Sequence, residues 1–111
     1  SCSGCSNVAQ LANHVALELD RQGLAEMSCI AGIGGKVKPL LKLARSRRPI
    51  IALDGCALHC TRHCLEGIDV TASLHLTLTD MDVRKVKHQD FTSEDFQAVF
   101  AKVSDTLLSI T

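Results

Sequence analysis

Six cysteines occupy three short stretches of this chain of 111 residues: Cys2 and Cys5, then Cys29, then Cys56, Cys60 and Cys64. Each stretch lies where an apolar, strand-like run ends or a predicted helix begins. The carboxyl ends of parallel strands meet at one edge of a sheet, and ligands bind at that edge. We therefore expect the three groups to be neighbours in space. A cluster of thiolates with few carboxylates beside it is typical of a zinc site.

The spacing of the cysteines indicates which of them could be ligands. A tetrahedral zinc takes four, with sulfur at about 2.3 Å. Cys2 would lie at the first strand-to-helix turn, Cys29 at or near the second strand, and Cys56 at the third. Cys60 is one helical turn beyond Cys56, so both side chains can face the same point. The predicted ligands are Cys2, Cys29, Cys56 and Cys60, with Cys5 and Cys64 as secondary candidates. Cys29 could instead be an ordinary core residue, because a buried free cysteine behaves as a small hydrophobic side chain.

Two other chemistries remain open. Cys2-Ser3-Gly4-Cys5 before a helix has the placement of a thiol–disulfide redox motif, because the helix dipole would stabilise a thiolate there. That interpretation leaves four cysteines unused. Cys56 and Arg62 have the C-x5-R spacing of a phosphate-binding loop enzyme, although residues 57–59 look helical. No Ser-His-Asp set or close carboxylate pair indicates hydrolysis, so the sequence favours a binding protein over an enzyme.

Other polar residues lie near the cysteines. Asp54 ends a buried strand and could accept hydrogen bonds from the next turn, support the ligands, or be an ordinary turn residue. His59 and His63 flank Cys60 and are expected to face solvent, with a role as supporting donors or alternate ligands still open. His14 is placed on the polar face of the first helix. His75, like His88, has no identifiable partner.

Hydrophobic periodicity predicts the elements that hold these residues. Helical spacing of apolar residues covers residues 7–22, 37–44, 56–65 and 92–109. Apolar or alternating runs predict strands at 27–31, 50–53 and 74–79, with a short strand or an extended loop at 84–87. We therefore expect one α/β domain over residues 1–111, with three layers, a three- to four-stranded, mainly parallel sheet and about four helices. Because Cys2 directly precedes a helix, a further strand is expected upstream of it.

Composition restricts the partners. The chain has no Trp, no Tyr and three Phe, so its core must be aliphatic. Twelve basic and twelve acidic residues cancel, which argues against a nucleic-acid binder, and the basic run at 45–48 is read as a solvated helix end. No apolar run is long enough for a membrane span, and no export or lipidation motif is present. We expect a cytoplasmic protein with reduced thiols and a metal ion as its partner.

Three segments carry a family resemblance: Cys2-Ser3-Gly4 followed by Asn7-Val8-Ala9-Gln10-Leu11, then Cys29-Ile30-Ala31-Gly32-Ile33-Gly34-Gly35, then Asp54-Gly55-Cys56-Ala57-Leu58-His59-Cys60. In this order they resemble the DGC-domain family of bacteria and archaea, which is named for its Asp-Gly-Cys motif. Members are described as zinc-binding through four cysteines. The resemblance therefore implies zinc, held by Cys2, Cys29, Cys56 and Cys60, in a structural or a metal-handling role. Cys5 and Cys64 are additions to the pattern, so six thiols could exchange as ligands or hold a second metal.

Overall fold

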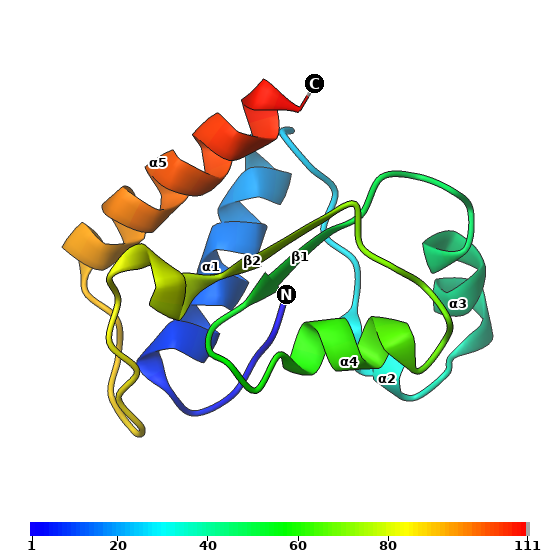
Figure 1. Cartoon of the computed structure of the whole chain (residues 1–111), viewed down its shortest axis with the longest axis horizontal. Helices are drawn as coiled ribbons and strands as arrows, with labels where there is room; N and C mark the ends of the chain where they lie inside the picture. The colour runs from blue at the N-terminus through cyan, green and yellow to red at the C-terminus, as the bar shows by residue number, and fades with distance from the viewer. Residues whose placement is uncertain (111) are drawn as a thin grey trace.

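The computed structural model describes residues 1–110. Its elements follow one another as α1 (Asn7–Arg21), α2 (Ile30–Gly34), α3 (Lys38–Ala44), β1 (Ile51–Asp54), α4 (Cys60–Glu66), β2 (Leu74–Thr77), the 3₁₀ helix η1 (Leu78–Met81) and α5 (Ser93–Ser109). Helices α1 and α5 lie on one side of the short sheet, and α2, α3 and α4 lie on the other (Figure 1). The predicted α/β arrangement with helices on both faces is therefore present.

The sheet is smaller than predicted. In residues 1–110 it has two strands rather than three or four, with β1 and β2 parallel and Ile51 opposite Leu74. The expected strand at 27–31 is not formed. Residues 27–29 belong to no sheet, and residues 30 and 31 are the start of α2. The backbone N–H of Met27 donates to Asp20 Oδ1 at 2.9 Å instead of to a neighbouring strand. Segment 84–87 is an extended loop with one antiparallel bridge, between Ser6 and Lys87.

The helices differ from the prediction in two places. Helix α4 begins at Cys60 and not at residue 56, because His59 has a left-handed backbone with a φ of 52°. The short helix α2 lies where a strand was expected, so residues 1–110 contain five α-helices rather than about four. The first helix begins as predicted, with the Ser6 hydroxyl accepting a hydrogen bond from the Ala9 N–H at 3.2 Å.

Strand β1 separates two hydrophobic clusters. Leu53 packs into the larger one, which α1 and α5 dominate. Ala52, its neighbour, packs into the smaller one with Ile33 of α2 and Leu65 of α4. Successive side chains of a strand point to opposite faces, so both faces of β1 are covered, as its continuous apolar run predicted. No helix within residues 1–110 has the length and hydropathy needed to span a bilayer.

Candidate functional site

The predicted site lies at the carboxyl end of β1, where the first residues of the chain run beside the strand. The Cys2 N–H donates to the Leu53 carbonyl at 2.9 Å, and the Gly55 N–H donates to Cys2 Sγ at 3.1 Å. Gly55 must lack a side chain, since a Cβ there would lie 2.7 Å from the Val8 carbonyl. The glycine of Asp54-Gly55-Cys56 therefore lets the turn after β1 pack directly on the first turn of α1.

The Cys2 sulfur is held in a buried, polar position, and the side chain is 9% exposed. Burial raises the pKa of the Cys2 thiol, the Gly55 N–H donor lowers it in part, and the nearby Asp54 and Cys60 raise it further. A raised pKa means that Cys2 is a neutral thiol unless a cation is close to it. The charge effect of Cys60 also places that residue within electrostatic range of Cys2.

Asp54 fixes the start of α4 to the end of β1. Its carboxylate is 1% exposed and accepts hydrogen bonds from the Thr61 N–H at 2.7 Å and the Arg62 N–H at 3.2 Å. His75 Nε2 lies 2.7 Å from the same carboxylate. Burial raises the pKa of Asp54, but the hydrogen bonds from Thr61, His75 and Arg62 outweigh burial and lower it overall. Asp54 is therefore a buried anion that orients the helix carrying Cys60 and Cys64.

The structure brings some of the predicted ligands together. Cys60 is the first residue of α4, near Cys2, and Cys64 lies one turn further along. Cys64 is close to α2, because a Cβ on Gly34 would lie 3.3 Å from its sulfur. The Ser1 nitrogen is within electrostatic range of both Cys2 and Cys64. Cys2, Cys60 and Cys64 therefore lie in the same region of the molecule, near the start of the chain, and we call them the thiol grouping.

The remaining cysteines are placed differently. Cys29 is exposed at the residue before α2, and it lines the cavity that Ser1 also lines. The half-buried Cys56 packs against the α1–α5 cluster, and the Lys85 amino group donates to its sulfur at 3.3 Å. Cys5 is exposed, and its carbonyl accepts a hydrogen bond from the His88 N–H at 3.2 Å. Cys5 thus takes no part in the thiol grouping.

The thiols suit zinc by type, although they are not preassembled. Within residues 1–110, no three His, Cys, Asp or Glu side chains converge closely enough to hold a metal ion. All six cysteines are free, so no disulfide removes a thiol from the donor set. Cys2 and Cys60 come from different parts of the chain, and Cys60 is within electrostatic range of Cys2. A four-thiolate site therefore requires the cysteines to rearrange from the positions described here.

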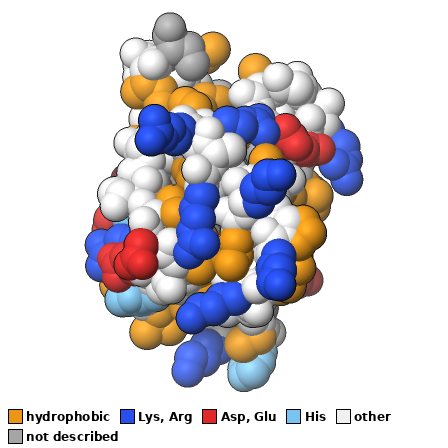
Figure 2. All heavy atoms as spheres, turned by 90° about the vertical axis from the view of Figure 1, so that its right-hand side faces the viewer, with side chains coloured by type: hydrophobic (Ala, Val, Ile, Leu, Met, Phe, Trp, Pro, Cys, Tyr) orange, Lys and Arg blue, Asp and Glu red, His pale blue; other side chains and the backbone are white. Residues whose placement is uncertain are grey.

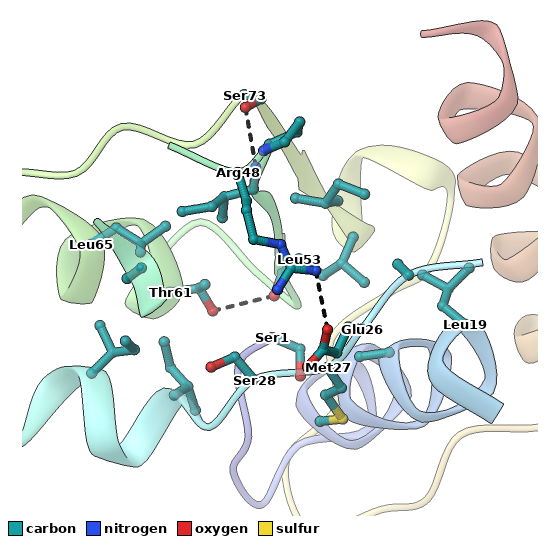
Figure 3. A pocket seen from close by; sticks show the side chains of 18 of the residues that line it. Ser1, Leu19, Glu26, Met27, Ser28, Arg48, Leu53, Thr61, Leu65 and Ser73 are labelled. Carbon is teal, nitrogen blue, oxygen red and sulfur yellow. Dashed lines mark hydrogen bonds and ion pairs between the residues drawn. The ribbon is translucent and has the colours of Figure 1, made fainter. Parts of the chain in front are cut away.

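An apolar cavity of about 420 Å³ lies beside this grouping (Figure 3). It separates residues 26–29 from β1, so it lies where the missing strand was expected. Leu53 and Leu65 form part of its wall, while the Thr61 hydroxyl donates to the Leu53 carbonyl at 3.3 Å. The Ser1 hydroxyl is buried there without a hydrogen-bond partner among the described residues. Arg48 and Glu26 also line the cavity and form an ion pair at 3.1 Å.

Neither alternative chemistry gains support from the geometry. A redox pair at Cys2 and Cys5 would need a readily ionised thiol, whereas the pKa of Cys2 is raised mainly by burial. Helix α1 begins beyond both cysteines, at Asn7. A phosphate loop from Cys56 to Arg62 would need free backbone N–H groups. Those of Thr61 and Arg62 already donate to Asp54, and the Arg62 side chain pairs with Glu66 at 3.4 Å.

Three residues have partners that were not expected from the sequence, and two of them, His75 and Lys85, are at the site. His75 is the partner of Asp54, and its ring lies 5.0 Å from that of His59, centroid to centroid. The alternation of Leu74 to Thr79 predicted a strand that contains His75. The pairing with Asp54 could be predicted only if the register between the two strands were also known. Lys85 lies in a loop whose contact with Cys56 no local pattern indicates. His14 is half-buried rather than on a polar face, and packs against Phe96 at 4.7 Å.

Known proteins resemble this chain over nearly its full length. The chain is 53% identical over 107 residues to the "anaerobic and virulence modulator AnvM" of Pseudomonas aeruginosa, which is 96% of this chain and 82% of that protein. No solved structure matches the chain. The sequence pattern of the DGC domain matches residues 1–103. The chain therefore belongs to the DGC-domain family.

Proposed function

We propose that this chain is a zinc-binding protein whose metal is held by cysteine thiolates at the carboxyl end of β1. The observation that supports the proposal is that Cys60 lies within electrostatic range of Cys2, and Cys64 within range of the neighbouring Ser1, although these cysteines come from opposite ends of the first 64 residues. Thiolates from separate elements are the donors that zinc prefers in small domains. Cys29 or Cys56 completes a set of four after the rearrangement described above.

The buried Cys2 supports the proposal in a second way. A thiol whose pKa is raised by burial gains most from a nearby cation, because the cation offsets the cost of the buried negative charge. The Gly55 N–H already points at this sulfur and would donate to the thiolate. Bound zinc would supply the positive charge that keeps the thiols ionised. Asp54 holds α4 in place, and thereby keeps Cys60 beside Cys2.

A metal-handling role accords better with this geometry than a purely structural one. Cys29 and Cys60 are exposed, so zinc at this position would be accessible to a competing ligand.

Zinc content per chain tests the proposal. Protein purified under reducing conditions without chelator should contain about one zinc by elemental mass spectrometry. Cys2→Ser and Cys60→Ser should lose most of the zinc, while Cys5→Ser, an exposed cysteine outside the grouping, should retain it. Circular dichroism should show all three variants folded. Absence of zinc from the wild type, or equal loss in Cys5→Ser, would refute the proposal.

A further inference from the structure

The charges of this chain are unevenly distributed along it. Six of its twelve basic residues lie between Glu26 and Asp54, and that stretch contains no acidic residue. The six are Lys36, Lys38, Lys42, Arg45, Arg47 and Arg48, and we call them the basic face. They lie on α3 and on its two flanking turns, and all six are exposed. A chain with no net charge thus carries a strongly positive region on one side.

Most of these charges lack a counter-charge. Arg48 pairs with Glu26 at 3.1 Å, and the Arg45 side chain donates to the Ile68 carbonyl at 3.2 Å. In the part of the chain that the structure describes, no carboxylate pairs with Lys36, Lys38 or Lys42, and the same holds for Arg47. The basic face therefore presents at least four charges that an anionic partner could neutralise.

Apolar surface is interleaved with these charges. Val37 is 48% exposed and Leu43 is 37% exposed, and both belong to the same stretch as the basic residues. Figure 2 shows hydrophobic atoms exposed between the Lys and Arg side chains on this side of the molecule. Leu43 and Arg48 also line the cavity beside β1. A mixture of positive and apolar groups matches a partner that carries acidic and apolar groups in alternation.

We propose that the basic face binds an acidic segment of another protein, whose carboxylates contact the lysines and arginines while its apolar side chains cover Val37 and Leu43. Charge complementarity identifies the partner, since every unpaired charge here is positive. A nucleic acid is disfavoured because the surface lacks aromatic stacking platforms: the chain has no Trp or Tyr, and its three Phe residues pack against the α1–α5 cluster. The proposal rests on the charges and apolar side chains of this surface and does not depend on the metal.

The backbone offers a variant that separates binding from stability. Arg47 has a φ of 66°, in the left-handed region that glycine adopts without strain. Arg47→Gly therefore removes one charge of the basic face while relieving backbone strain, so the folded state should not be weakened. Lys42→Gln and Lys102→Gln form a matched pair, because both residues are exposed on helices and only Lys42 belongs to the basic face.

The experiment uses a fluorescein-labelled synthetic peptide of repeating Glu-Glu-Leu-Leu, measured by fluorescence anisotropy with and without chelator. The wild type should bind it, and added salt should weaken binding. Arg47→Gly and Lys42→Gln should each raise Kd by about fivefold or less, as expected for one partly screened charge. Triple replacement of Lys36, Lys38 and Lys42 by Glu should raise Kd at least about tenfold, while Lys102→Gln leaves it unchanged.

Several outcomes would overturn the proposal. It fails if the wild type does not bind the peptide, or if Lys102→Gln weakens binding as much as Lys42→Gln does. Tighter binding to duplex DNA, or to phosphatidylglycerol vesicles, than to the peptide would also refute it. Unfolding temperatures measured alongside should be unchanged or raised for Arg47→Gly. Weaker binding by a variant of full stability then reports the lost charge alone.

Discussion

Replacing the buried carboxylate of Asp54 by an amide should destabilise the fold without changing its shape. Asn at this position keeps one oxygen to accept from the Thr61 N–H. Its NH₂ group replaces the oxygen that faces the Arg62 N–H, at 3.2 Å, and His75 Nε2, at 2.7 Å. The imidazole can change tautomer to accept a hydrogen bond, but the Arg62 N–H can only donate. At least one charge-assisted hydrogen bond is lost, and two donors then face each other.

The cost can be estimated from these contacts. A hydrogen bond to a charged group contributes about 1.5–3 kcal/mol, and an unsatisfied buried donor costs about 1–3 kcal/mol. Because the two terms overlap, we expect Asp54→Asn to lower the free energy of unfolding by about 2–3 kcal/mol. For a domain of this size that corresponds to a fall in Tm of about 10 °C. Asp90→Asn, at an exposed carboxylate, is the control and should change Tm by less than about 2 °C.

The dependence on pH tests the same carboxylate. The pKa of Asp54 is lowered in the fold, from an ordinary value of about 3.9, so its ionised form stabilises the native state. This contribution is fully present above the ordinary pKa and is lost as pH falls through the lowered one. Thermal unfolding followed by circular dichroism should therefore show a constant gap between wild type and Asp54→Asn from pH 7 to about pH 5, narrowing below about pH 4. Equal Tm values for Asp54→Asn and Asp90→Asn would refute the assigned role.

Two further substitutions examine how the start of the chain is attached to the rest. Gly55→Ala would bring a Cβ within 2.7 Å of the Val8 backbone, which cannot yield as a flexible side chain would, so a loss of about 1–3 kcal/mol is expected in urea unfolding. An unchanged urea midpoint would contradict that contact. Asn7→Ala removes a side chain that accepts from the Val86 N–H at 2.7 Å, so amide exchange at Val86 should accelerate while exchange within β1 does not. Uniform acceleration would instead indicate global destabilisation.

The elements predicted correctly from the sequence were the long helices with a repeated apolar pattern and the strand that is covered on both faces. Helices α1 and α5 repeat their apolar residues over several turns, and β1 is a continuous apolar run, so each was recognised. The interpretation of Asp54 as an acceptor for the following turn was confirmed, because a strand-ending Asp has few other donors within reach.

Other features depended on contacts that local patterns do not encode. A short apolar run such as 27–31 is compatible with strand or helix, and α2 formed because Gly32 allows Leu40 of α3 to pack against it. A Cβ at Gly32 would lie 3.2 Å from Leu40 Cγ. A helix was predicted from residue 56, but the left-handed backbone of His59 delays its start to Cys60. The pairing of His75 with Asp54 requires the register of β1 and β2, which no single strand reveals.

The hydrogen bonds of Asp54 also bear on how quickly a metal could exchange at this end of the sheet. They close the loop between β1 and α4 through carboxylate oxygens, and sulfur takes no part in that closure. Departure of a thiolate-bound ion would leave the loop closed and α4 in place, so recapture would need local rearrangement of the cysteines but no refolding of this loop. Motions of side chains and short loops take picoseconds to microseconds, whereas a site that unfolds on metal loss must refold first. The rate of exchange would then be set by the chemistry of ligand replacement rather than by folding.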